Sequence, residues 1–104
     1  MRRDDYVAAF NAGVRTGDWA AMLALVHDDA TLEFVGIPVG PFHGRAAIGE
    51  AYMQQPPDDE LVLLDDTTYA WAREPERPAG ELHLEERDGE ITRISVHYGQ
   101  FPSR

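Results

Sequence analysis

The chain has 104 residues, of which 43% are hydrophobic, so it is long enough for one globular domain and too short for two. Nineteen acidic residues against nine basic residues give a formal net charge of -10, which disfavours binding to nucleic acid and to anionic membranes. The sequence contains no cysteine, which excludes disulfide bonds, thiolate metal sites and cysteine nucleophiles.

The start of the sequence resembles neither a secretion signal nor a membrane span. Residues 1–5 lead directly into an amphipathic segment, and the longest aliphatic run, residues 61–64, is far too short to cross a bilayer. We therefore expect one cytoplasmic domain that covers residues 1–104 and has no nucleic-acid or membrane partner.

Two segments near the N-terminus have the apolar spacing of amphipathic helices. The first runs from Asp4 to Gly13, with one apolar stripe and two aspartates at its positive end. Asp18 is the expected N-cap of the second helix, which continues to Val26 and stops at residues 28–29. Both helices are expected to line the same core.

A strand, a loop and a third helix follow. Residues 31–35 alternate, so Leu32 and Phe34 share one face of a strand and Glu33 lies on the other. Residues 36–41 contain two prolines and two glycines and predict a loop, which we place at the rim of a pocket. Residues 45–54 form the third expected helix, which a pair of prolines ends.

The second half of the chain predicts four strands, at residues 61–64, 67–73, 81–87 and 90–98. Asp88 and Gly89 join the last two in a hairpin with a type I′ turn. Three helices followed by antiparallel strands predict an α+β domain in which a curved sheet wraps around the helices. The concave side of such a sheet forms a pocket.

The register of the last hairpin decides which side chains reach that pocket. Without a bulge, His83 shares the inner face of the sheet. With a bulge near residues 92–93, Leu82 and Leu84 take that face instead. We favour the bulge, because it keeps both strands apolar on the inside.

Three stretches of sequence resemble a known superfamily. Residues 6–13 read YVAAFNAG, residues 27–34 read HDDATLEF, and residues 42–48 read FHGRAAI. In this order they resemble the nuclear transport factor 2-like superfamily, and within it the branch of ketosteroid isomerases and SnoaL-like polyketide cyclases. The resemblance implies a cone-shaped α+β fold, with three helices packed in a curved antiparallel sheet. It also implies isomerase or cyclase activity on a small hydrophobic molecule.

The resemblance further implies roles for particular residues. Tyr6 matches the tyrosine that donates a hydrogen bond to the dienolate oxygen in ketosteroid isomerases. The two acidic positions of those enzymes are Phe34 and, in the bulged register, Leu82. Because phenylalanine cannot accept a proton, the usual route through an aspartate is doubtful.

Tyr6 and His83 are therefore the candidate catalytic residues. The hydroxyl of Tyr6 is a hydrogen-bond donor for developing negative charge, and His83 is a general base if the hairpin has no bulge. The alternatives are a packing role for Tyr6 and an outer-face position for His83.

An aromatic and aliphatic lining is expected around Tyr6, formed by Trp19, Phe34, Tyr52, Trp71, Leu82 and Tyr98. Such a cavity suits a small apolar or polycyclic ligand. The same side chains can instead fill the core, leaving a noncatalytic domain whose sheet serves for self-association.

The sequence predicts neither a metal site nor a cofactor. Its histidines lack the spacing of metal ligands, and it has no phosphate-binding glycine loop. The outer face of the sheet is expected to carry a mixture of polar and apolar side chains, which predicts a homodimer.

Overall fold

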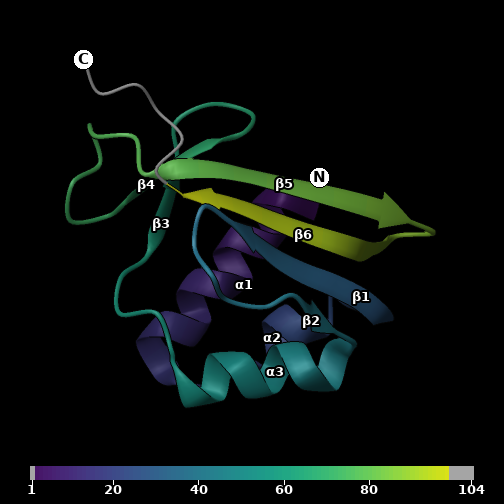
Figure 1. Ribbon diagram of the computed structural model, residues 1–104. Coiled ribbons are helices and arrows are strands. Elements are labelled where there is room, and N and C mark those ends of the chain that lie inside the picture. Colours follow the sequence, from purple (N-terminus) through teal and green to yellow (C-terminus); the bar gives the residue numbers. More distant parts are fainter. Residues whose placement is uncertain (1, 99–104) are drawn as a thin grey trace.

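The computed structural model of the chain describes the backbone of residues 2–98 and the side chains of residues 4–97. These residues form one curved sheet wrapped around helices (Figure 1). The elements in chain order are α1 (Arg2–Thr16), α2 (Ala20–Leu23), β1 (Val26–Val35), β2 (Phe42–His43), α3 (Arg45–Gln54), β3 (Leu61–Leu63), β4 (Thr68–Trp71), β5 (Gly80–Arg87) and β6 (Glu90–Tyr98). The predicted α+β class is confirmed.

The strands lie in the order β2-β1-β6-β5-β4-β3. All neighbours are antiparallel except β1 and β6, which run parallel. The sheet is thus mixed rather than wholly antiparallel. The parallel pair arises because β6, the last strand in the chain, lies beside β1, the first. This pairing joins β2 and β1 to β5, β4 and β3 in one sheet.

Helix α1 extends beyond the predicted end at Gly13 and finishes at Thr16. Gly13 is buried against the ring of Trp19, which leaves no room for a Cβ atom, and this close packing outweighs the low helix propensity of glycine. At the end of α1, the hydroxyl of Thr16 donates a hydrogen bond to the carbonyl of Ala12 at 2.8 Å.

The second helix is much shorter than predicted. Asp18 does cap it, because its Oδ1 accepts a hydrogen bond from the backbone N–H of Ala20 at 2.9 Å. The predicted continuation to Val26 is wrong, since α2 ends at Leu23 and β1 begins at Val26.

Strand β1 starts early because β6 offers it hydrogen-bonding partners. The backbone N–H of Ile91 donates to the carbonyl of Leu25 at 2.9 Å, and Val26 pairs with Ile91. In the strand conformation, Val26 and Ala30 are both fully buried. Pairing and burial therefore outweigh the local preference for a helix. His27 consequently lies within a strand, not at the end of a helix.

The prediction holds for the third helix but not for three of the short strands. Helix α3 has the predicted bounds, and β3 and β4 are shorter than predicted. The sequence did not predict β2, whose two residues pair with Thr31 and Leu32 of β1. Such a short strand depends on its neighbour for all its hydrogen bonds.

The turn between β3 and β4 is stabilised by Asp65. Its Oδ1 accepts hydrogen bonds from the backbone N–H groups of Thr68 at 2.8 Å and of Thr67 at 3.0 Å. These bonds, that of Thr68 foremost, favour the ionised carboxylate and lower the pKa of Asp65.

The last hairpin confirms the predicted turn and the bulged register. Asp88 and Gly89 have φ angles of 54° and 82°, the positive values that a type I′ turn requires. The register shifts between Glu85 and Glu86, so Leu82 pairs with Val96 and Leu84 with Ile94. The inner face of the hairpin is consequently apolar.

The core lies between this inner face and the helices. Its largest fully buried side chains come from both layers and are Tyr6, Met22, Val26, Leu32, Ile48, Tyr69, Leu82, Ile91 and Ile94. Within residues 2–98, no helix combines the length and apolar character needed to cross a membrane.

Candidate functional site

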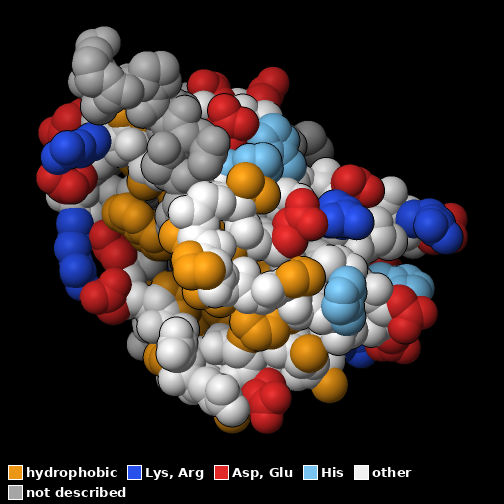
Figure 2. Space-filling model, viewed as in Figure 1, with side chains coloured by type: hydrophobic (Ala, Val, Ile, Leu, Met, Phe, Trp, Pro, Cys, Tyr) orange, Lys and Arg blue, Asp and Glu red, His pale blue; other side chains and the backbone are white. Residues whose placement is uncertain are grey.

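A cavity of about 550 Å³ lies inside the cone formed by the sheet, α1 and α3. Figure 2 shows hydrophobic side chains gathered in a hollow of the surface in the region between β3 and the loop after β1. Seven aromatic residues contribute to the lining: Tyr6, Phe10, Phe34, Phe42, Tyr52, Tyr69 and Trp71. The walls of this cavity are therefore mainly apolar.

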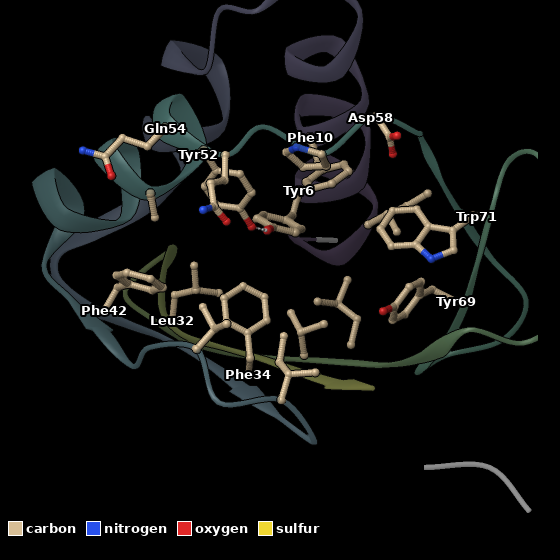
Figure 3. A pocket seen from close by; sticks show the side chains of 18 of the residues that line it. Tyr6, Phe10, Leu32, Phe34, Phe42, Tyr52, Gln54, Asp58, Tyr69 and Trp71 are labelled. Atoms are coloured by element: carbon tan, nitrogen blue, oxygen red, sulfur yellow. Dashed lines mark hydrogen bonds between the residues drawn. The ribbon is translucent and has the colours of Figure 1, made fainter. Parts of the chain in front are cut away.

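Two tyrosine hydroxyls meet in this cavity. The hydroxyl oxygens of Tyr6, on α1, and Tyr52, on α3, lie 3.2 Å apart and form a hydrogen bond in which either can donate (Figure 3). The two side chains are only 1% and 7% exposed. Because both groups are shielded from water, a ligand oxygen beside them would form strong hydrogen bonds.

The helices position these tyrosines by simple spacing. Tyr6 and Phe10 lie one turn apart on the inner face of α1, and Ile48 and Tyr52 do so on α3. The ring of Tyr52 is held by Trp19, with ring centroids 4.9 Å apart, and by the edge of Phe10 at 6.0 Å. The tyrosine pair is thus preorganised by aromatic packing.

The two positions that are acidic in ketosteroid isomerases line the cavity as apolar residues. Phe34 of β1 faces it and contacts the edge of Phe42, with centroids 6.4 Å apart. Leu82 of β5 is 2% exposed and also lines it. Among the described residues, Asp58 is the only charged side chain in the lining, and it is exposed.

His83 lies on the opposite face of the sheet from the cavity. It pairs with Ser95, while its neighbour Leu82 points inward. Its Nε2 lies 2.8 Å from Oε1 of Glu81, and its ring contacts that of His97, with centroids 5.1 Å apart. This position corrects the expectation that His83 acts as the general base, because its ring faces away from any ligand in the cavity.

Glu33 also lies on this outer face. Its carboxylate accepts hydrogen bonds from Nη1 of Arg93 at 2.6 Å and from the hydroxyl of Ser95 at 2.9 Å. The strand alternation that predicted Phe34 inside and Glu33 outside is therefore confirmed. Among the described side chains, no group of three acidic or histidine residues is arranged to hold a metal ion.

The other predicted lining residues divide into three groups. The cavity is lined by Tyr52 and Trp71, as expected. Trp19 corrects the prediction, because it is 4% exposed and packs behind Tyr52 without lining the cavity. The side chain of Tyr98 lies outside the described residues.

Sequence reasoning missed three aromatic lining residues, which are Phe10, Tyr69 and Phe42. Tyr69 lies two residues before Trp71 on β4, with ring centroids 5.6 Å apart, and strand alternation would have placed both on one face. Phe42 belongs to the unpredicted strand β2 and carried no such signal. The predicted rim is present, since residues 37–39 border the cavity.

A comparison with protein families matches residues 5–68 to the SnoaL-like domain, which is more than half of the 104 residues. No curated protein sequence matches the chain.

Three solved structures have a similar fold at low sequence identity. A candidate isomerase from Rhodopseudomonas palustris has a TM-score of 0.68 and 13% identity, with 95% of this chain and 90% of that chain covered. A candidate polyketide cyclase from Xanthomonas campestris pv. campestris has a TM-score of 0.58 and 24% identity, with coverage of 94% and 90%. A Mycobacterium tuberculosis protein in complex with estradiol-17β-hemisuccinate has a TM-score of 0.65 and 15% identity, with coverage of 91% and 92%.

The family match covers α1, β1, α3 and the start of β4, which contribute most of the cavity wall. The structural likenesses cover nearly the whole chain and include proteins of the nuclear transport factor 2-like type. The chain therefore belongs to the SnoaL-like domain family and has the fold of the nuclear transport factor 2-like superfamily.

Proposed function

We propose that the protein binds a small, polycyclic hydrophobic molecule in its cavity and that Tyr6 donates a hydrogen bond to an oxygen of this ligand. The observation that carries the proposal is an apolar cavity of about 550 Å³ with the paired hydroxyls of Tyr6 and Tyr52 in its wall. Ligand cavities in proteins have volumes of roughly 300 to 1,000 Å³ and few polar groups. A domain whose core were filled by side chains would lack such a space.

The same geometry supports only weak isomerase or cyclase activity. A hydrogen bond from Tyr6 would stabilise negative charge on a ligand oxygen, because Tyr52 holds the hydroxyl pair in place. A proton must also be removed from carbon, and Phe34 provides no acceptor for it. We therefore assign to the native protein a binding function with slow turnover of a β,γ-unsaturated ketone.

The substitution Tyr6→Phe tests this assignment. It removes one hydroxyl from the cavity and keeps the ring, so we expect the Kd for estradiol to rise about tenfold, the value of one well-placed hydrogen bond. Isothermal titration calorimetry with native and substituted protein measures the change.

The matched ligand is 3-deoxyestradiol, which lacks the phenolic oxygen. Its Kd should be the same for native and substituted protein, since its one remaining oxygen, the 17β-hydroxyl, lies at the other end of the steroid from the position that Tyr6 would contact. Equal losses of affinity for both steroids would assign Tyr6 a packing role instead. Failure of the native protein to bind either steroid would contradict the proposed function.

The outer face of the sheet supports a second proposal, that the protein forms a homodimer. Helices cover only the inner face, and the outer face presents Val35, Glu33, Arg93 and His97. A face with an arginine, a carboxylate and apolar groups can complement a copy of itself across a two-fold axis.

Sedimentation equilibrium at micromolar concentration should give twice the 11.6 kDa mass of one chain. Val35→Glu should shift the mass towards the monomer, because it places a new charge on the proposed interface. Met53→Glu is the control, since Met53 is 74% exposed on α3 and distant from this face. A native protein that sediments as a monomer would exclude the dimer.

A further inference from the structure

The polar groups of the cavity are divided between a buried part and an exposed rim. The hydroxyls of Tyr6 and Tyr52 belong to side chains that are almost fully buried. Gln54, Gln55 and Asp58 also line the cavity and are exposed, and Figure 3 shows Gln54 and Asp58 on opposite sides of it. A long ligand bound here therefore has one end beside the tyrosines and the other at the rim.

The rim has negative local charge. Among the described residues, no lysine or arginine lines the cavity, and Asp58 supplies its only charge. Arg73 lies nearby, with Nη1 3.8 Å from Oδ2 of Asp58, but its Nε is also 3.8 Å from Oδ2 of Asp59. One guanidinium thus faces two carboxylates, and the group as a whole keeps one negative charge.

Among the described residues, only Asp58 brings its charge to the cavity, whereas the other charged side chains do not line it. The formal charge of -10 is spread over the surface and is screened over about 8 Å at physiological ionic strength. Asp58 borders the cavity itself, so a charged ligand group on its side of the opening lies beside this carboxylate.

We propose that Asp58 is a specificity-determining residue that rejects ligands with a carboxylate at the outer end and admits uncharged ones. The preferred ligand has a carbonyl or phenol oxygen at its inner end and an uncharged hydrogen-bond donor, such as an amide or hydroxyl, at its outer end. Such a donor suits the acceptor oxygens of Asp58, Gln54 and Gln55. This inference rests on the proposed function and specifies its ligand class.

The test compares two steroids that differ in one terminal group, 3-oxo-4-androstene-17β-carboxamide and 3-oxo-4-androstene-17β-carboxylate. Both offer the same ketone to Tyr6 and have nearly the same shape, but only the second is charged at neutral pH. We expect native protein to bind the amide about tenfold more tightly at low ionic strength, falling to about threefold near physiological salt. Titration calorimetry at both salt concentrations gives the ratio of the two Kd values.

Asp58→Asn should reduce this ratio to about twofold at low ionic strength, because it removes the charge beside the ligand and keeps the side-chain shape. The side chain of Asp58 is 88% exposed, so the substitution leaves the core intact. Asp66→Asn is the matched control. It makes the same change in net charge at an exposed aspartate that does not line the cavity, so the ratio should stay at the native value.

The outcomes separate the two proposals. Equal binding of both steroids by native protein, or equal effects of Asp58→Asn and Asp66→Asn, would overturn the role of Asp58 and leave the binding function intact. Failure to bind either steroid would overturn the proposed function and this inference together. A ratio that falls with Asp58→Asn alone supports both.

Discussion

Phe34→Asp is expected to raise the rate of isomerisation of a β,γ-unsaturated steroid ketone by about a hundredfold to ten-thousandfold, the usual contribution of a positioned general base. Phe34 and Tyr6 lie on opposite walls of the cavity (Figure 3). An aspartate at position 34 would therefore face a ligand whose oxygen is bound by Tyr6. The appearance of the conjugated enone, followed by its ultraviolet absorbance, measures the rate.

Two variants separate proton transfer from other effects of a polar side chain in the cavity. Phe34→Asn has nearly the same size and shape as the aspartate but is uncharged and accepts no proton, so its rate should stay at the native level. The double variant Phe34→Asp with Tyr6→Phe should lose most of the gained rate, because the ligand oxygen is no longer stabilised. A folded Phe34→Asp protein with the native rate would show that position 34 is not placed to reach the substrate.

Gly80→Ala is expected to lower the free energy of unfolding by about 3 kcal/mol. A Cβ atom at position 80 would overlap the backbone oxygen of His97 and approach the ring of Tyr69 to 2.9 Å. Since Gly80 pairs with both β4 and β6, the backbone cannot shift without disturbing two strands. Thermal unfolding should show a melting temperature lower by roughly 10 to 20 °C.

Gly49→Ala is the control for this substitution. Its Cβ would meet only the end of the flexible Leu23 side chain, at 2.9 Å from Cδ1, and alanine favours the helical conformation of α3. The melting temperature of Gly49→Ala should therefore stay close to the native value. A Gly80→Ala protein as stable as this control would mean that β4, β5 and β6 approach less closely than described.

The sequence by itself determined the features that depend on local spacing and on backbone preference. Helix α3 has its predicted bounds because apolar periodicity marks its inner face and two prolines follow it. The type I′ turn at Asp88 and Gly89 forms as predicted, because few residue pairs adopt two positive φ angles. Strand alternation likewise placed Phe34 inside the cone and Glu33 outside it.

Only the tertiary structure decided where α2 gives way to β1, because the pairing of Val26 with Ile91 joins residues far apart in the sequence. The cavity has the same origin. Tyr6 and Tyr52 are separated by 46 positions, and their hydrogen bond exists because the sheet packs α1 and α3 together. Asp58 reaches the rim by the same closure of the cone, and no local pattern indicates it. The residues that line the cavity are thus brought together by contacts between distant parts of the chain, and such contacts leave no periodic pattern in the sequence.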